Sequence, residues 1–406
     1  MLETGKTPVL RPHCGAAFAL LLLLWLACGA PEAPGSKDQI AGVLRDSLLL
    51  LAAQNLHAAP ETVTSSRSPR SAGGPHDFYS EGDYWWPDSL DPAGPYVRRD
   101  GLTNPENFLD HRRAVVRLSE IVGNLASAYL LTKDERYAAA ARQHLRAWFL
   151  TDSTRMNPHL LYAQAIQGRF TGRGIGIIDG IHFMEVVQAT RILEKHGQLP
   201  PTEFRAIQDW FTAFVGWLST HPYGIEERDH PNNHGTCWNM QVGLYAVFTG
   251  QDSLAASCRE RYRSDLLPRQ MAADGSFPLE LERTKPYGYS LFNLDAMAMN
   301  CLVLSTATED LWTYTAPDGE NLRLGLEYLA PYVADKSAWP LPPDVMYWEN
   351  WPVAQPALLF GGLRFGRPEW IEIWSQHAHF PTVEEVRRNL PIRNPLLWLD
   401  LVPVAE

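Results

Sequence analysis

The sequence predicts an all-α fold in which helical hairpins are arranged as an α/α toroid, complete or incomplete. From Arg112 onward, apolar residues recur at the spacing of amphipathic helices. Strand signals are sparse, and proline and glycine cluster between the helical segments, where turns and connections are expected.

A weak internal repeat supports the hairpins. Thr132 and Thr249 are each followed, at identical offsets, by Tyr137-Ala138-Ala139 and Leu254-Ala255-Ala256, and then by an arginine. Both segments follow an apolar helix and open another, as expected if each hairpin buries its apolar face on the next. Chance similarity between two amphipathic helices is the alternative explanation.

The chain divides into a signal peptide over 1–28, a flexible tether and N-terminal segment over 29–75, and the toroid domain over 76–400. After a first helix that starts near residue 112, further helices are expected at 134–150, 181–196, 201–220, 236–248 and 290–306.

The first residues have the features of an export signal. Lys6 and Arg11 precede an apolar run over 16–27 that is short for a membrane span. The run ends at Cys28, in a sequence similar to a lipoprotein cleavage site, although Trp25 is atypical there. We expect an exported protein, periplasmic or anchored in the outer membrane by lipidation of Cys28, with plain export as the alternative.

Composition limits the possible partners. A net charge of −11 without a basic stripe excludes a typical nucleic-acid partner. It permits an anionic ligand, because a few arginines in a cleft create a local positive field. The 14 Trp and 15 Tyr fill a core or line a groove for sugar rings. The remaining cysteines have no metal-type spacing and are expected to be buried apolar residues: Cys237, Cys258 and Cys301.

The segment Asn232-Asn233-His234 lies between two predicted helices. As an isolated pair, Asn233 would be a helix cap and His234 an ordinary polar residue. A metal site is also conceivable, because His230 and His234 are four residues apart. Pro231 disfavours a continuous helix through both histidines, so no metal or other cofactor is expected.

A second segment places two phenols beside two cations. Arg283 and Lys285 precede Tyr287 and Tyr289 within seven residues. A tyrosine ordinarily titrates at about pH 10, and a neighbouring guanidinium favours the phenolate. The alternative is a loop whose tyrosine rings cover the core.

A third segment combines aromatic and basic residues outside the helices. It contains Tyr84 and Trp85, followed by Arg98 and Arg99. Such residues suit a wall or lid that holds an acidic sugar chain, or an N-terminal arm packed across the toroid. Trp348 lies in another aromatic, proline-containing stretch of this kind.

Five segments in the right order resemble the alginate lyase domain of bacterial polysaccharide lyases, from about residue 75 to 375. They are Tyr84-Trp85-Trp86-Pro87, residues 94–101, residues 172–179, residues 232–236 and residues 287–293. The resemblance implies an α/α toroid, an Asn-His pair, and an arginine followed by a catalytic tyrosine. These roles fall on Asn233, His234, Arg283 and Tyr289, with Tyr287 as the alternative phenol.

The resemblance also implies the reaction: β-elimination in a 4-linked uronic-acid polymer, with alginate in mannuronate-type linkages as the expected substrate. Glucuronan or another uronan remains open. The expected contacts to this anionic polysaccharide come from Tyr84, Trp85, Arg98, Arg99, Asn232, Tyr287 and Trp348.

Two other classes of protein remain as alternatives. A toroid glycoside hydrolase would need two carboxylates across the cleft, for which Glu280 with Glu282, or Glu226 with Asp229, are candidates. A non-catalytic glycan-binding lipoprotein would keep the aromatic groove without needing a reactive tyrosine.

Overall fold

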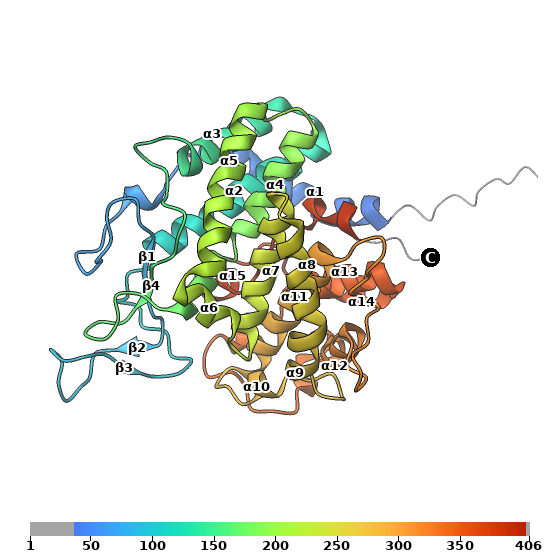
Figure 1. The fold of residues 1–406 in the computed structure, drawn as a ribbon. Helices are drawn as coiled ribbons and strands as arrows, with labels where there is room; N and C mark the ends of the chain where they lie inside the picture. Colours follow the sequence, from blue (N-terminus) through green and yellow to red (C-terminus); the bar gives the residue numbers. More distant parts are fainter. Residues whose placement is uncertain (1–35, 403–406) are drawn as a thin grey trace, which may run out of the picture.

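Helices dominate the computed structural model, which describes residues 36–402 (Figure 1). The α-helices are α1 (Ser36–Asn55), α2 (Asp110–Thr132), α3 (Glu135–Phe149), α4 (Phe183–Lys195), α5 (Pro201–Thr220), α6 (Pro222–Arg228), α7 (Asn233–Phe248), α8 (Asp252–Arg261), α9 (Leu267–Gln270), α10 (Pro278–Leu281), α11 (Pro286–Leu304), α12 (Leu322–Ala334), α13 (Pro356–Phe365), α14 (Pro368–Gln376) and α15 (Glu384–Arg388). The prediction of an all-α fold is confirmed.

Four short strands accompany the helices, and they lie together at one side of the helical body (Figure 1). They are β1 (Tyr79–Glu81), β2 (Trp85–Trp86), β3 (Val97–Arg98) and β4 (Tyr162–Ala165). Strand β1 pairs in parallel with β4, and β2 pairs antiparallel with β3.

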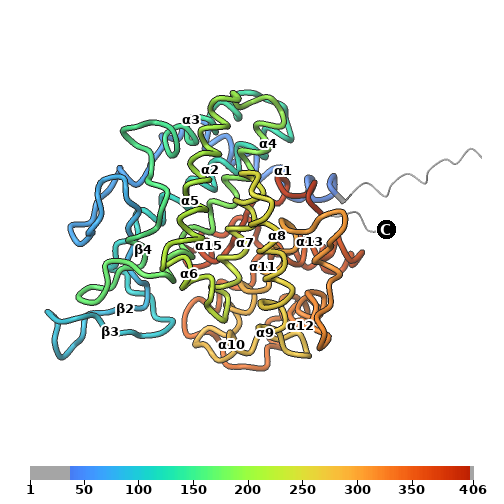
Figure 2. Tube along the Cα trace, viewed as in Figure 1, coloured from blue at the N-terminus to red at the C-terminus, as the bar shows by residue number. Residues whose placement is uncertain are grey.

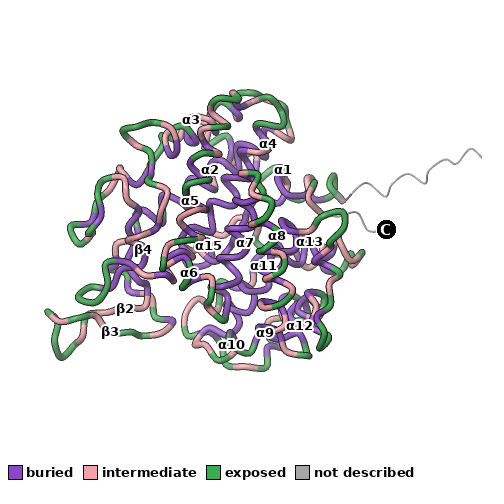
Figure 3. The backbone as a smooth tube through the Cα atoms, viewed as in Figure 1, coloured by how far each residue is buried: buried purple, intermediate pink, exposed green. Residues whose placement is uncertain are grey.

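The helices form two layers around the core. Helices α2, α4, α7, α11 and α13 contact one another in that order and make the inner layer (Figure 2). The outer layer packs on it: α1 and α3 on α2, α5 and α8 on α7, α12 on α11, and α14 on α13. Every residue of α11 is buried, as its almost continuous apolar sequence requires (Figure 3).

The two repeat segments are corresponding helical hairpins. Thr132 ends α2 and Thr249 caps α7, and each hydroxyl donates to the carbonyl four residues earlier. The next residues, Lys133 and Gly250, both have left-handed backbones, with φ of 59° and 71°. This conformation ends the first helix and turns the chain into the second. The hairpin interpretation of the repeat is therefore confirmed.

Two helices begin earlier than predicted. Helix α7 starts at Asn233, where the side chain of Asn232 caps the first turn, and α11 starts at Pro286. In α11 the cap is the carboxylate of Asp344, which accepts two backbone N–H bonds of 2.9 Å. This cap is distant in the sequence, so local pattern could not reveal it. Asn233, His234 and Tyr289 therefore lie in first helical turns, whereas Arg283 lies in the bend before α11.

The expectation of a flexible tether over 29–75 is wrong for residues 36–55, which form α1. Ile40, Leu44, Leu48 and Ala52 recur every four residues and are buried against α2. The predicted signal peptide and the lipidation of Cys28 lie outside the described residues and stay predictions. The other three cysteines are free and buried, as expected.

The C-terminal segment packs against α4 and α2. The buried carboxylate of Glu185 on α4 accepts from the backbone N–H of Arg393, at 2.6 Å, and from Asn394 Nδ2, at 2.5 Å. Arg387 on α15 pairs with Glu120 on α2. Glu384 of α15 also pairs with Arg113 in the first turn of α2, at 3.0 Å, so α15 lies along the first half of α2.

We predict that α1 contributes directly to stability. Leu44→Ala should lower the free energy of unfolding by about 2–5 kcal/mol, because it leaves a cavity between α1 and α2. Leu50→Ala, in the same helix but 62% exposed, should change it by less than about 0.5 kcal/mol. Urea denaturation followed by circular dichroism measures both, and equal effects of the two substitutions would contradict the packing of α1.

Candidate active site

A cavity of about 180 Å³ opens where the strands meet the first turns of α7 and α11. All four predicted catalytic residues line it: Asn233, His234, Arg283 and Tyr289. So do four of the predicted substrate-binding residues: Tyr84, Trp85, Arg98 and Asn232. The segment around β2 and β3 is thus a wall of the cavity.

The other predicted binding residues do not line the cavity. Tyr287 is fully buried, and its hydroxyl donates to the carbonyl of Tyr332 at 2.9 Å, so it serves the core. Trp348 packs edge-on against Tyr287, with ring centroids 5.3 Å apart. Arg99 lies over the ring of Trp86. The assignment of Tyr287 is corrected, because helix α11 turns it away from the face that carries Tyr289, while substrate contacts by Arg99 and Trp348 outside this cavity stay predictions.

Asn233 is held by a buried acid. Its backbone N–H and its side-chain amide donate to the two oxygens of Glu280, at 2.8 and 2.7 Å. Burial raises the pKa of Glu280. The bidentate contact fixes the amide at the cavity wall, where a second amide hydrogen is available to a bound group.

His234 is oriented by a second buried acid. Its Nδ1 lies 2.8 Å from Oε1 of Glu227, which is inaccessible to solvent. Burial, assisted by Arg283 and Arg173, lowers the pKa of His234 to about 3, and burial raises that of Glu227. The imidazole is therefore neutral at neutral pH, and within residues 36–402 its Nε2 has no protein partner.

Arg283 is placed between an acid and the phenol. Its Nη2 lies 3.1 Å from Oδ1 of Asp100 and 3.4 Å from the hydroxyl of Tyr289, and its guanidinium covers the Tyr289 ring. Asp100 also accepts from Arg98 at 2.6 Å. Although burial opposes ionisation, the two guanidiniums lower the pKa of Asp100 to about 2. One carboxylate thus orients two arginines.

The hydroxyl of Tyr289 begins a buried chain of polar contacts. It lies 2.7 Å from the hydroxyl of Tyr84, which in turn accepts from Lys285 Nζ at 2.8 Å. An ammonium only donates, so the hydrogen of Tyr84 can point either at Tyr289 or at Oε1 of Glu385, which lies 3.3 Å away. Lys285 is paired with Glu385 and is almost fully buried.

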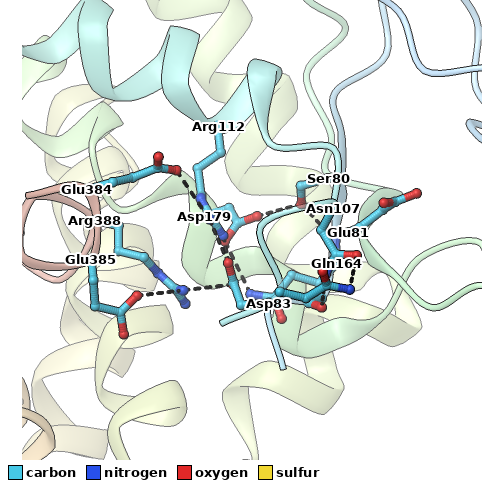
Figure 4. Close-up of polar contacts among 12 residues, drawn as sticks. Ser80, Glu81, Asp83, Asn107, Arg112, Gln164, Asp179, Glu384, Glu385 and Arg388 are labelled. Atoms are coloured by element: carbon cyan, nitrogen blue, oxygen red, sulfur yellow. Dashed lines mark hydrogen bonds and ion pairs between the residues drawn. The ribbon is translucent and has the colours of Figure 1, made fainter. Parts of the chain in front are cut away.

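The chain continues through ion pairs between three distant segments. Arg388 lies 3.1 Å from Glu385 and 2.7 Å from Asp83, and Asp83 makes a bidentate contact with Arg112, at 2.7 and 2.8 Å (Figure 4). Asp83, Arg112 and Glu385 are buried. Burial alone would raise the pKa of Asp83, but the two arginines hold it well below its usual value.

Sequence reasoning missed most of the residues that orient the site. For two of them, the available signal was their position in the sequence. Lys285 lies between the catalytic candidates Arg283 and Tyr289, and Glu227 lies between the acids Glu226 and Asp229. Glu385 and Arg388 carry no local motif, and only the path of the C-terminal segment brings them to the cavity.

The acids of the site do not fit a hydrolase. Asp83 is the only carboxylate among the described residues that line the cavity, and both its oxygens are in ion pairs. Glu280 is engaged with Asn233, and Glu226, Asp229 and Glu282 are exposed outside the cavity. Across residues 36–402, no group of three or more His, Cys, Asp or Glu side chains is arranged to hold a metal.

The cavity combines donors that can neutralise an acidic group with two groups that can exchange protons. Asn233 and Arg283 offer N–H donors, His234 offers a neutral imidazole, and Tyr289 offers a phenol. Four arginines among the lining residues give the cavity a positive character in a protein of net charge −11.

Comparisons with known proteins agree with this arrangement. A model of the alginate lyase family matches residues 62–339. An alginate lyase from Bacteroides ovatus is 32% identical, with a TM-score of 0.76, over 90% of this chain and 97% of that chain. A variant of alginate lyase A1-III, an enzyme of Sphingomonas species A1, complexed with a tetrasaccharide, has a TM-score of 0.52 and 13% identity over 87% of this chain and 93% of that chain.

At 13% identity, the similarity to alginate lyase A1-III is one of fold alone. A comparison with curated protein sequences found no match. The fold of these solved lyases is an α/α toroid, and the predicted toroid is thereby confirmed.

We predict that Asp83 holds the site together. Asp83→Asn should lower the free energy of unfolding by about 3–5 kcal/mol, because it removes the acid that the buried guanidiniums of Arg112 and Arg388 share and leaves them with their longer pairs to Asp179 and Glu385. Asp91→Asn, an exposed change on the same segment, should have little effect. Guanidinium chloride or urea titrations compare the variants.

The effect of Asp83→Asn should depend on pH. An aspartate whose pKa is lowered by folding contributes stability that is complete when the pH is above its pKa in the unfolded chain, about 4. This stability is lost as the pH falls through the pKa of the folded protein. The difference between wild type and variant should therefore shrink in acid. A constant difference down to the acid limit would contradict the ion pairs.

Proposed function

We propose that the chain, which belongs to the alginate lyase family and is a polysaccharide lyase, cleaves a 4-linked uronic-acid polymer by β-elimination. The proposed substrate is alginate in its mannuronate-type linkages, and the proposed product carries a 4,5-unsaturated end. The observation that supports this best is the convergence of Asn233, His234, Arg283 and Tyr289 on one cavity.

Asn233 and Arg283 are proposed to neutralise the C6 carboxylate of the residue that loses its proton. The hydrogen at C5 is acidified by this carboxylate only when its charge is balanced. Both side chains are fixed by acids, Glu280 and Asp100, so their donors are oriented before substrate binds. Preorganised donors of this kind stabilise the enolate-like charge that develops in the transition state.

Tyr289 is proposed to remove H5 and then protonate O4 as the linkage breaks. In mannuronate and glucuronate both atoms lie on the same face of the ring, so one phenol can perform both transfers. The guanidinium of Arg283 and the hydroxyl of Tyr84, backed by Lys285, can stabilise negative charge on the Tyr289 oxygen.

In guluronate, H5 and O4 lie on opposite faces, and two groups are needed. His234 is proposed as the base for this linkage, with Tyr289 as the acid. When Nδ1 carries the proton and donates a hydrogen bond to Glu227, the Nε2 atom presents its lone pair to the cavity. The mechanism uses side chains of the chain alone.

The proposal is tested by incubating the purified protein with polymannuronate, polyguluronate and glucuronan. Formation of the unsaturated end is followed by its absorbance in the near ultraviolet. The highest rate is expected on polymannuronate. Cleavage that yields only saturated ends would indicate a hydrolase, and binding without cleavage would indicate a glycan-binding protein. A preference for glucuronan would correct the substrate and leave the mechanism in place.

We predict that Tyr289→Phe lowers kcat by roughly a hundredfold or more, the usual scale for a general acid–base group. KM should change little, because the hydroxyl acts mainly in the transition state. Steady-state kinetics on polymannuronate measures both. Tyr287→Phe is the matched control, since it removes a buried hydroxyl two residues away that does not face the cavity. Wild-type rates in a folded Tyr289→Phe variant would refute the assignment.

For His234→Ala we predict a dependence on the linkage. On polyguluronate the variant should show no measurable turnover, because the proposed base is gone. On polymannuronate it should keep residual activity, because Tyr289 performs both transfers. Equal losses on the two polymers, measured by initial rates, would argue against separate bases.

A further inference from the structure

The cations that line the cavity differ in how their charge is balanced. Arg98 and Arg283 share Asp100, at 2.6 and 3.1 Å, and Arg388 is paired with acids on two sides. Arg173 also lines the cavity. No carboxylate oxygen in the part of the chain that the structure describes lies within 4.0 Å of its guanidinium. Among the described residues, Arg173 therefore has no direct ion-pair partner, and Asp179, Glu226 and Asp83 act on its charge only from a distance.

The guanidinium of Arg173 is nevertheless held in a defined position. Its Nε donates to the carbonyl of Gln164 at 2.8 Å, and its Nη2 donates to Gln164 Oε1 at 3.1 Å. Gln164 Nε2 donates to Asp179 at 3.2 Å, which fixes the amide so that its oxygen faces Arg173. The Nη1 group has no partner among residues 36–402, and its hydrogens are available to a ligand.

The support behind Arg173 is strained. Gln164 has a φ of 49°, a left-handed conformation that is unfavourable for a residue with a side chain. Ser80 maintains it, accepting from the backbone N–H of Gln164 at 2.9 Å and donating to Asp179 at 2.5 Å; Figure 4 shows these three side chains. Strain that the surrounding contacts maintain is characteristic of functional positions.

An aromatic face lies beside the same guanidinium. The centre of the Trp85 ring is 5.8 Å from Arg173 Cζ. The backbone of Gly82 packs against both side chains: a Cβ there would lie 2.9 Å from Arg173 Nη2 and 2.8 Å from Trp85 Cδ1. A cation beside a flat ring is a suitable surface for an acidic sugar, which offers a carboxylate and C–H groups.

The charge state of Arg173 agrees with a role in binding anions. Burial, and then Arg98, lower its pKa to about 10 against the opposing effect of nearby acids, so it stays protonated at neutral pH but without a carboxylate in direct contact. A buried cation of this kind reduces the stability of the empty protein. An anion in the cavity would remove that cost.

We propose that Arg173 binds the carboxylate of a second uronate residue, adjacent to the residue that loses its proton, while the sugar ring lies on Trp85. This inference rests on the proposed function, in which Asn233 and Arg283 take the first carboxylate. It makes Arg173 a specificity-determining residue. The enzyme would require two consecutive uronates and would discriminate against polymers in which uronates alternate with neutral sugars.

The test compares Arg173→Gln with wild type on polymannuronate, by the absorbance of the unsaturated product. Arg173→Gln should raise KM by about tenfold to a hundredfold, the scale of one lost charged hydrogen bond, and should largely keep kcat. Arg169→Gln is the matched control: its guanidinium lies 5.6 Å from the same Trp85 ring, but it does not line the cavity. Its constants should be those of wild type.

A second substrate makes the test specific. Partial reduction of the carboxyl groups of polymannuronate leaves few consecutive uronates. This reduction should lower kcat/KM strongly for wild type and much less for Arg173→Gln, because the variant no longer binds the second carboxylate. The same relative loss for both proteins would overturn the proposal.

Other outcomes separate this inference from the proposed function. If both proteins form the unsaturated product and Arg173→Gln keeps its KM, the inference fails and the proposed function stands. A fall in kcat at unchanged KM would place Arg173 at the reacting residue and would also overturn it. If wild type forms no unsaturated product, both fail. The free energy of unfolding should be unchanged or higher in Arg173→Gln, and a clear loss would indicate a structural role instead.

Discussion

The ion pairs of Asp83 with Arg112 and Arg388 are the contact on which the geometry of the site depends. They join three segments that are far apart in the sequence: the strand region, α2 and α15. Tyr84 and Trp85 directly follow Asp83, so the anchored carboxylate places both rings at the cavity. Arg388 also holds Glu385, which balances Lys285. Because each charge is buried, the loss of one partner leaves the others with less compensation for the cost of desolvation.

Shared acids allow the cavity to remain positive while its arginines stay ordered. Asp100 serves two guanidiniums, and Asp83 serves two more. Each arginine is thus held in place, but the summed charge of the lining is not cancelled. A polyanion can therefore be attracted to a protein whose net charge is −11, because the local field and not the total charge acts within the cleft.

The features that the sequence predicts are those determined by neighbouring residues. The start of α3 follows from the capping side chain of Asp134, and the two hairpin turns follow from matching segments. The pairing of Asn233 and His234, and that of Arg283 and Tyr289, were also accessible from local motifs. The cap that Asp344 gives α11 and the arrival of Arg388 at the cavity depend on contacts between remote segments. No periodicity records such contacts, and for the same reason the sequence could not decide whether Tyr287 meets the substrate or covers the core.

The position of α1 has a consequence for how the molecule can be attached to a surface. Lys37, near the start of α1, pairs with Asp400 at 2.6 Å, so the two ends of the described chain are neighbours. They lie on the side of the helical body opposite β2 and β3, which form a wall of the cavity (Figure 1). A support or fusion partner joined at either end would therefore leave the cleft facing outward, toward a long polymer approaching from solution. The adjacent ends also make the fold suitable for circular permutation, with new termini opened in an exposed turn away from the cleft.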